Sequence, residues 1–401
     1  MRIAVYAIAH NDEVEIDGWC EATNEADHRV VLDTGSTDCG VRHLEQKGVA
    51  VHRAIIHPWR CDDALNAAVA LLPADVEVCF RVDMHDRLRL GWRTLIEQSW
   101  LPDTGSLRHR YQATSDHSYY HQRVHSRFEF RWSGPFRPSL TWRGEGDILP
   151  VVVDNLIVER QPRTPRQVSY LPLLQEGVQE NPSDPKRAFW LADALLDEGC
   201  VQEGISEINR YITLAGSAGE GTAFLLRKLA LADEMDAFHY LQAAQTAHPS
   251  ASNHLAFAEQ YFRRQEWGNC YLACQYAISL LRSAPRRVLE PTDDPRLRGP
   301  RLHDLMAASA WNLWDFEAAY GHAVEAVRRA PQDDVLIAHL NQIHAKIQAG
   351  GTLDPNMENT DPPAAIEPQQ KSGLTVIHRK RQVRNIDEFL PTETIKMESA
   401  G

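Results

Sequence analysis

Two short turns in the first part of the chain carry side chains that could do chemistry. The first, Asp33–Asp38 (DTGSTD), follows an apolar run that ends in Asp33. A carboxylate at a strand end can accept hydrogen bonds from a base NH or a ribose hydroxyl, and Gly35 allows close backbone approach. The pattern favours binding of a nucleotide, and a capped strand–helix turn is the simpler alternative.

The second turn places Asp83, His85 and Asp86 at the end of another apolar run. Carboxylate and imidazole ligands at this spacing suit Mn²⁺ or Mg²⁺ bridging a diphosphate. Such a cation would neutralise the charge that develops on a leaving nucleoside diphosphate. The motif alone is also typical of a surface turn, and its position after the Asp33 turn favours the metal site.

Strands and helices alternate around these two turns. The apolar runs Ile3–Ala9, Arg29–Leu32, Val49–Ala54 and Glu77–Val82 indicate strands. Helices are predicted between them, at Glu13–Ala26, Val41–Lys47 and Cys61–Leu72. This alternation predicts a mostly parallel, Rossmann-like α/β sheet, and ligands of such sheets bind at the carboxyl ends of the strands.

From about residue 166 the pattern changes to helices only. Similar helix–turn–helix stretches recur with a spacing of about 34 residues, which is the period of tetratricopeptide repeats. Ala192, Ala258 and Ala310 are expected at the buried packing points of these pairs, and an irregular helical bundle is the alternative. We therefore predict domains at 1–165 and 166–346.

Residues 347–401 differ again in composition. Gly350, Pro355 and further prolines lie among polar residues, which predicts a disordered tail. The basic cluster at 378–384 is either a solvated charge run or a docking peptide.

The 401 residues carry 55 acidic and 42 basic side chains, a net charge of −13 that argues against a protein coating DNA along its whole surface. No apolar run approaches the roughly 20 residues that a membrane span needs. The first residues do not form a signal peptide, because His10–Glu15 interrupts the apolar run. We therefore expect a cytoplasmic protein without membrane contact.

Taken together, three stretches and two single residues resemble family-2 glycosyltransferases of the GT-A fold, in the subgroup with C-terminal tetratricopeptide repeats. His10–Glu13 stands where members read Lys-Asn-Glu-Glu, Leu32–Asp38 matches their Val-Asp-Thr-Gly-Ser-Thr-Asp almost letter for letter, and Val82–Asp86 (VDMHD) stands where they read Leu-Asp-Ala-Asp-Glu. Members also carry a Trp and an Arg-Asn pair beyond the third strand; Trp59 and Asn66 match, but Leu65 stands in place of the arginine.

The resemblance implies an α/β GT-A fold (a nucleotide-diphospho-sugar transferase) followed by an all-α, tetratricopeptide-like repeat domain. It implies a nucleotide-sugar donor site, whose residues would be Asn11, Asp33, Gly35, Asn66 and Asp83. It also implies a Mn²⁺ or Mg²⁺ cofactor held by Asp83, His85 and Asp86. Because His85 replaces a carboxylate, the metal preference should lean toward manganese.

The acceptor region departs from the family. Many relatives carry Trp-x-Gly-x-Val-His-Glu, where this chain reads Trp132–Pro138 with Arg137 in place of the histidine. The catalytic base expected there is missing. Glu145 and Asp147 are the best replacements and Asp116 is a third, each with a solvated loop acid as the alternative.

The segment 108–143 is unusually basic and aromatic for an acidic protein. Its arginines are Arg108, Arg110, Arg123, Arg127, Arg131, Arg137 and Arg143. The aromatic side chains are either core residues of the sheet or part of an acceptor surface that includes Trp132, Arg137 and Trp142. If these side chains form an acceptor surface, nucleic acid is a further candidate partner.

These observations favour a metal-dependent, inverting glycosyltransferase that moves a sugar from a nucleotide donor, most plausibly a UDP-sugar, to a protein or peptide docked by the repeats. One alternative is a phage-type DNA glycosyltransferase that acts on hydroxylated bases. The other is a decayed transferase that serves as a repeat-based adaptor.

Overall fold

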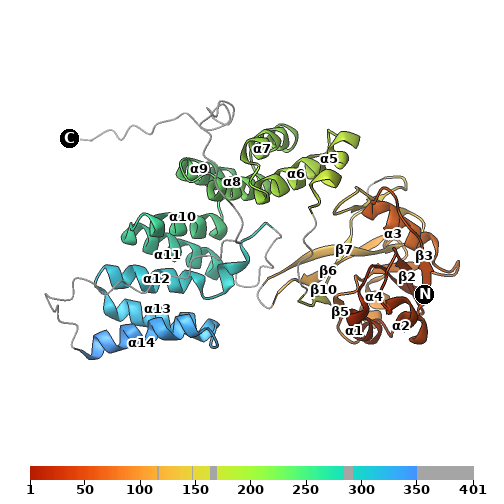
Figure 1. Cartoon of the computed structure of the whole chain (residues 1–401), viewed down its shortest axis with the longest axis horizontal. Coiled ribbons are helices and arrows are strands. Elements are labelled where there is room, and N and C mark those ends of the chain that lie inside the picture. Colours follow the sequence, from red (N-terminus) through yellow and green to blue (C-terminus); the bar gives the residue numbers. More distant parts are fainter. Residues whose placement is uncertain (115–116, 147, 163–168, 284–291, 350–401) are drawn as a thin grey trace. The chain divides into compact units, whose positions relative to one another are not determined.

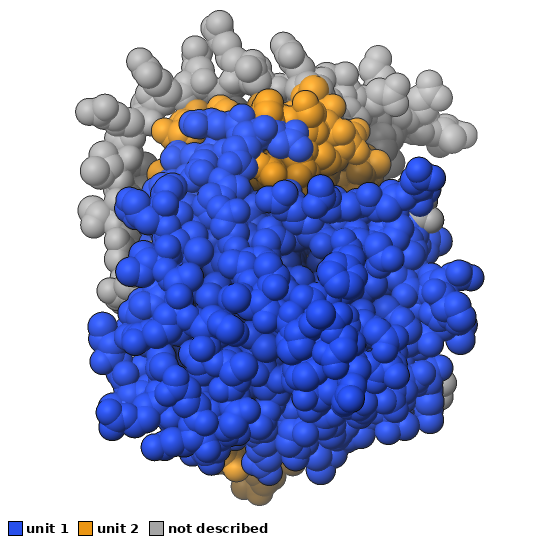
Figure 2. Space-filling model, turned by 90° about the vertical axis from the view of Figure 1, so that its right-hand side faces the viewer, with its two compact units in different colours: residues 1–181, 288–291 blue, residues 182–287, 292–401 orange. Residues whose placement is uncertain are grey.

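The computed structural model describes residues 1–114, 117–146, 148–162, 169–283 and 292–349 (Figure 1). The chain divides into two compact units, residues 1–181 with 288–291, and residues 182–287 with 292–401 (Figure 2). Asp116, Asp147 and the whole tail from residue 350 lie outside the described residues. The last helix ends at Gln348, just past the predicted start of the tail at residue 347. No helix in the described ranges combines the length and the apolar character needed to cross a bilayer.

The first unit is built on an eight-stranded mixed sheet in the order β3-β2-β1-β4-β7-β6-β10-β5. Its strands are β1 (Ile3–Ala9), β2 (His28–Asp33), β3 (Ala50–Arg53), β4 (Val78–Arg81), β5 (Asp86–Leu88), β6 (Ser106–Gln112), β7 (Ser118–Ser126) and β10 (Val151–Arg160). Strands β1 to β4 run parallel, as the alternating pattern predicts. β7 enters antiparallel between β4 and β6, and β5 pairs antiparallel with β10.

Helices cover both faces of this sheet. They are α1 (Ile16–Ala22), α2 (Gly40–Gln46), α3 (Cys61–Ala70) and α4 (Trp92–Ser99), with a single 3-10 turn η1 (Glu13–Glu15) before α1. Val5 of β1 packs into a core with Trp19 and Trp92, while the next residue, Tyr6, packs on the opposite face with Leu65. Strands buried on both faces are expected to be continuously apolar, which explains why their sequences are easily recognised.

Two further elements complete the first unit. A small antiparallel sheet is formed by β8 (Phe130–Ser133) and β9 (Ser139–Trp142), and β8 lies against α3. Helix α5 (Leu171–Glu180) follows β10 in the chain and groups with this unit.

Among the described residues, the second unit consists of four pairs of helices followed by one last helix. The helices are α6 (Pro185–Asp197), α7 (Val201–Ala215), α8 (Glu220–Ala232), α9 (Ala237–Ala247), α10 (Ala251–Arg263), α11 (Trp267–Ser283), α12 (Arg301–Asn312), α13 (Phe316–Arg329) and α14 (Asp334–Gln348). Within each pair the two helices pack together, and the first helices also pack on one another. Ala192, Ala258 and Ala310 are 0, 0 and 1% exposed, which confirms their predicted burial.

Candidate functional site

The loops after β1 and β2 are joined by hydrogen bonds at the carboxyl edge of the sheet. Asn11, with a φ of 54°, accepts a bond from Thr37 N at 2.8 Å and donates its own backbone N–H to Ser36 Oγ at 2.9 Å. Two further hydrogen bonds join the same loops. Glu13 N donates to Asp38 Oδ2 at 3.0 Å, and Cys39 N donates to Glu13 Oε2 at 3.2 Å. Asn11 therefore fixes the shape of the Asp33–Asp38 turn.

Asp33 is fully buried and its carboxylate is engaged by its own turn. It accepts from Gly35 N at 3.3 Å and Ser36 N at 3.2 Å, and it pairs with Arg53 Nε at 3.3 Å. Burial alone would raise the pKa of Asp33, but these donors outweigh burial and the pKa lies below its ordinary value. Gly35 has a φ of 105°, a conformation that favours glycine.

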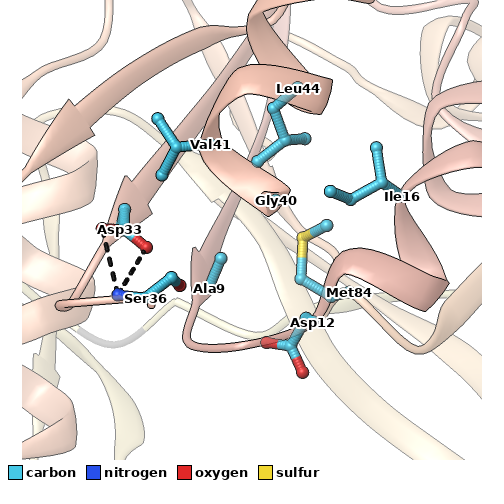
Figure 3. A pocket seen from close by; sticks show the side chains of 9 residues that line it. All are labelled: Ala9, Asp12, Ile16, Asp33, Ser36, Gly40, Val41, Leu44 and Met84. Carbon is cyan, nitrogen blue, oxygen red and sulfur yellow. Dashed lines mark hydrogen bonds between the residues drawn. The ribbon is translucent and has the colours of Figure 1, made fainter. Parts of the chain in front are cut away.

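A small cavity lies beside this turn (Figure 3). It is lined by Asp12, Asp33, Ser36 and Met84 among others, and it has a volume of about 10 Å³. That is room for about one water molecule. The cavity itself is therefore too small for a nucleotide, which would have to lie over the edge of the sheet.

Asp83, His85 and Asp86 come together in the tight turn between β4 and β5. One possible ligand atom from each lies within 4.8 Å of the others. Asp86 N donates to Asp83 O at 2.8 Å, which closes the turn. The side chains of Asp83 and His85 are 22 and 17% exposed, whereas that of Asp86 is 0% exposed.

Two arginines neutralise the carboxylates of this turn. Arg81 binds Asp83 through two hydrogen bonds of 2.9 and 3.1 Å. Arg123, from β7, places one nitrogen 3.3 Å from Asp83 Oδ2 and 2.7 Å from Asp86 Oδ2. Burial alone would raise the pKa of Asp83, but the guanidiniums of Arg81 and Arg123 lower it below the ordinary range.

Asp86 is further held by Tyr111 of β6, whose hydroxyl donates to Asp86 Oδ1 at 2.9 Å. Both oxygens of Asp86 are thus engaged inside the protein. Both oxygens of Asp83 are engaged too, by Arg81 and Arg123, but Asp83 and His85 remain partly exposed. A cation would share the Asp83 carboxylate with these arginines, and an oxygen with a nitrogen ligand suits manganese. The residues present therefore fit a cation held by Asp83 and His85, with Asp86 as the buried support of the turn.

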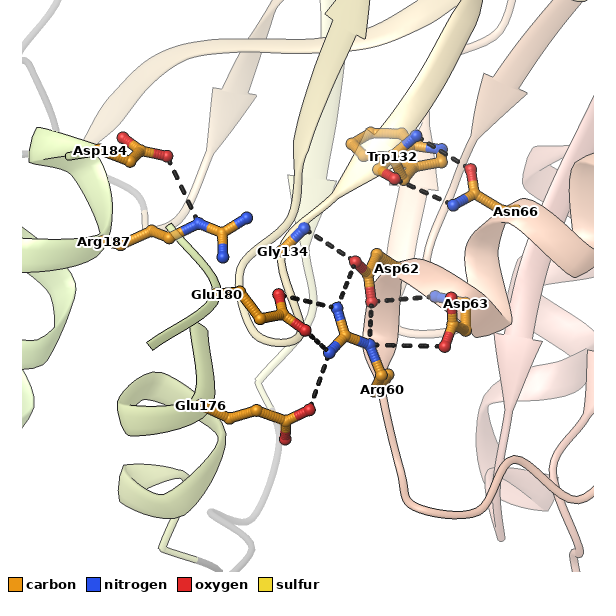
Figure 4. Close-up of polar contacts among 10 residues, drawn as sticks. All are labelled: Arg60, Asp62, Asp63, Asn66, Trp132, Gly134, Glu176, Glu180, Asp184 and Arg187. Carbon is orange, nitrogen blue, oxygen red and sulfur yellow. Dashed lines mark hydrogen bonds and ion pairs between the residues drawn. The ribbon is translucent and has the colours of Figure 1, made fainter. Parts of the chain in front are cut away.

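The predicted donor residue Asn66 lies against the predicted acceptor residue Trp132 (Figure 4). Asn66 Nδ2 donates to Trp132 O and Trp132 N donates to Asn66 Oδ1, both at 2.9 Å. The Trp132 indole is 2% exposed, donates to Tyr6 Oη at 2.7 Å and packs 5.2 Å from the Arg81 guanidinium. Trp132 is therefore a core residue, because its ring is enclosed and offers no face to an acceptor.

Arg60, which the sequence did not single out, gathers four carboxylates (Figure 4). It pairs with Asp62 at 3.0 Å, with Asp63 at 3.4 Å, with Glu176 of α5 at 2.8 Å and also with Glu180. Asp62 in turn accepts from Gly134 N at 2.9 Å. This cluster holds α5 against the start of α3. In the sequence, the only sign of the cluster was an arginine just before two acidic residues at a predicted helix start. Asp184 and Arg187, also drawn, pair with each other at 3.5 Å.

The other predicted acceptor and base residues lie around β8 and β9. Arg137, with a φ of 48°, is exposed and stacks on Phe136 at 5.8 Å. Trp142 is half-buried with its ring 5.1 Å from that of Phe130. Glu145 is exposed in the loop after β9, and Asp147 lies outside the described residues.

Several arginines of the segment 108–143 are used inside the fold. Arg123 binds the buried carboxylates, Arg127 donates to Leu72 O, and Arg110 donates to Ser118 Oγ at 3.1 Å. Arg108 stacks over Tyr120 at 5.6 Å. β7 also lies inside the sheet rather than at its edge. Among the described residues this arrangement gives no support for a nucleic-acid surface.

A larger, open cavity of about 530 Å³ lies where β6 and β10 end. It is lined by Gln112 and Thr114 at the end of β6 and by Glu159, Arg160 and Gln161 at the end of β10. Gln161 N donates to His85 O at 2.9 Å, and Arg160 is the strand partner of Asp86. The sequence did not indicate this cavity, because it depends on the pairing of β10 with β5 and β6.

Comparison with known proteins adds partial likenesses only. No family model and no curated protein matches the chain. A tetratricopeptide protein of Thermus thermophilus is 19% identical over 44% of this chain and 89% of its own, with a TM-score of 0.32. Glucosyl-3-phosphoglycerate synthase from Mycobacterium tuberculosis, in complex with Mn²⁺, UDP and glucosyl-3-phosphoglycerate, is 19% identical over 28% of this chain, with a TM-score of 0.24.

The crystal structure of the MamA protein is 14% identical over 40% of this chain and 81% of its own, with a TM-score of 0.30. The match to the synthase spans 44% of that enzyme's length. At such TM-scores we draw no functional conclusion from these likenesses.

Proposed function

We propose that this chain is a metal-dependent, inverting glycosyltransferase that moves a sugar from a UDP-sugar to a protein or peptide acceptor. The observation that carries the proposal is the Asp83–Asp86 turn. It places a half-buried carboxylate and a half-buried imidazole at the sheet edge, beside the guanidiniums of Arg81 and Arg123. The DTGSTD turn lies at the carboxyl ends of neighbouring strands, where α/β sheets bind nucleotides.

In this proposal the nucleoside lies along the turn built by Asn11, Asp33 and Gly35. The diphosphate lies at Asp83 and His85, which would hold Mn²⁺ or Mg²⁺. The cation would supply positive charge to the leaving nucleoside diphosphate. Arg81 and Arg123 cancel the charge of the two carboxylates, so the site is close to neutral before donor binds. We therefore expect the cation and the diphosphate to bind together.

The acceptor would occupy the cavity of about 530 Å³, whose lining residue Gln161 donates its backbone N–H to His85 O. Glu159 lines this cavity and pairs with Arg89 at 2.6 Å, which adds a fourth carboxylate to the base candidates Glu145, Asp147 and Asp116. An inverting transfer needs one carboxylate or imidazole to accept the proton of the attacking hydroxyl. Asn66 and Trp132 would support the site through packing rather than contact with substrate.

A hydrolysis screen tests the proposal without knowledge of the acceptor. Purified protein is incubated with individual nucleotide sugars and Mn²⁺ or Mg²⁺, and release of the nucleoside diphosphate is measured. We expect slow hydrolysis of one UDP-sugar, lost in His85→Ala. The matched control is His43→Ala, because His43 lies on α2 and pairs with Asp17 at 3.2 Å.

The alternatives predict other results. Failure to bind or hydrolyse any nucleotide sugar with manganese present would favour the repeat-based adaptor. Hydrolysis stimulated by DNA with hydroxylated bases, but not by protein acceptors, would favour the DNA glycosyltransferase.

A further inference from the structure

The segment Thr292–Arg298 lies across the first helices of successive pairs in the second unit. We call this segment, which ends in the 3-10 turn η2 (Pro295–Arg298), the strap. The backbone carbonyl of Thr292 accepts a hydrogen bond from Arg227 of α8. Ser252 of α10 donates to Asp293 Oδ1 at 3.1 Å and accepts from Asp294 N at 3.0 Å.

The second half of the strap is bound as specifically as the first. Arg296 forms two hydrogen bonds with Glu259 of α10, at 2.8 and 3.1 Å, and Arg301 at the start of α12 adds a third at 3.0 Å. Leu297 is 1% exposed and anchors the turn by burial. The strap thus presents acids near Arg227 and a base to Glu259.

The helix face beneath the strap is polar and largely enclosed. Asn253 and Ser252 are 0 and 1% exposed, and Glu259 is 4% exposed. Arg227 also donates to Asn253 Oδ1 at 2.9 Å. Buried polar groups are costly without hydrogen-bond partners, and this face is matched by an occupant that offers a carbonyl, a carboxylate and a guanidinium in that order. In the present structure the strap supplies all three.

We propose that the α8–α10 face is a peptide-binding surface, and that the strap is a built-in occupant that a partner peptide must displace. The partner is an extended peptide in which two adjacent acidic residues precede an arginine. The first acid would accept from Ser252 as Asp293 does, the second would hold the arginine as Asp294 holds Arg296 at 2.7 Å, and the arginine would pair with Glu259. The proposal concerns binding by the repeats alone, and it stands or falls separately from the transferase activity.

A linked strap competes at an effective concentration in the millimolar range, so a free peptide should bind the wild-type protein poorly. The probe is a fluorescein-labelled peptide with the sequence of residues 292–299 (TDDPRLRG), followed by fluorescence anisotropy with the full chain. Asp293→Ala/Asp294→Ala should loosen the strap, leave the face intact and tighten peptide binding at least about tenfold. The matched control is Asp333→Ala/Asp334→Ala, the acid pair at the start of α14.

Two further measurements locate the binding. A peptide in which the aspartates and arginines exchange places should not bind the loosened variant. Adding Arg227→Ala and Ser252→Ala to that variant should abolish binding of the original peptide. Should the acid variant fail to fold by circular dichroism, Arg296→Ala loosens the other end and serves the same test. Equal peptide binding by a folded loosened variant and the wild type, or binding retained without Arg227 and Ser252, would overturn the proposal.

Discussion

The side-chain amide of Asn66 exchanges two hydrogen bonds, each 2.9 Å long, with the backbone of Trp132. This pair joins α3 to β8 across 66 residues of sequence. It satisfies both backbone groups of a residue that is 2% exposed. Asn66 therefore holds the small sheet of β8 and β9 in place, whereas the sequence analysis predicts that Asn66 contacts the nucleotide-sugar donor.

The first prediction follows from this pair. Asn66→Ala leaves two buried backbone groups of Trp132 without partners, so the free energy of unfolding should fall by about 1 to 3 kcal/mol. Urea unfolding measures the loss, and Asn66→Asp should also be destabilised, because its carboxylate cannot donate to Trp132 O. The UDP affinity of the folded variant, measured by calorimetry, should stay within about twofold of wild type. A large loss of UDP affinity with unchanged stability would instead place Asn66 at the nucleotide.

The second prediction concerns the cation. Because Arg81 and Arg123 already balance Asp83 and Asp86, Mn²⁺ alone should bind weakly, and UDP should strengthen its binding by adding negative charge. With UDP present, His85→Ala should weaken Mn²⁺ binding at least about tenfold. Electron paramagnetic resonance of free Mn²⁺ provides the measurement, and His43→Ala serves as the control. An unchanged Mn²⁺ affinity in His85→Ala would mean that His85 is not a ligand of the cation and that Asp83 binds it without His85.

The third prediction separates Asp86 from the cation ligands. Asp86→Asn removes the charge that pairs with the buried Arg123 at 2.7 Å, so stability should fall by about 2 to 4 kcal/mol. Tyr111→Phe removes only one hydrogen bond to the same carboxylate and should cost about 1 kcal/mol. Both values come from urea unfolding. A stable Asp86→Asn protein that no longer binds Mn²⁺ with UDP would make Asp86 a direct ligand.

The fourth prediction is a pH dependence of stability. His125 Nδ1 lies 2.7 Å from Ser126 O and its Nε2 lies 2.9 Å from Tyr6 Oη, which suits a neutral ring. Burial lowers the pKa of His125 to about 4, against an ordinary value of about 6.5. Between these values the unfolded chain binds more protons than the folded chain, so stability falls as pH falls.

From pH 7 to pH 5 this histidine should cost roughly 1 to 2 kcal/mol of folding free energy. The cost is measured as the change in urea unfolding between the two pH values. His125→Gln should show a smaller change than wild type by about that amount. An identical pH dependence in both proteins would mean that His125 does not titrate in the native state with a lowered pKa.

The sequence by itself determined the elements that local patterns encode. The strand Ile3–Ala9, the end of the next strand at Asp33, the start of a helix at Cys61 and the burial of Ala192 all agree with the structure. Apolar periodicity and turn residues involve only a few neighbouring positions, so they can be recognised from the sequence alone. The close spacing of Asp83, His85 and Asp86 is likewise a local property.

Only the tertiary structure decided which distant side chains meet. Arg123 reaches Asp83 and Asp86 because β7 inserts antiparallel beside β4, and no local pattern specifies that neighbour. Trp132 is enclosed, and the strap is bound to Ser252, for the same reason. Both depend on contacts between segments far apart in sequence. Hydrogen bonds and ion pairs of this kind depend on strand order and helix packing, which local residue patterns constrain weakly.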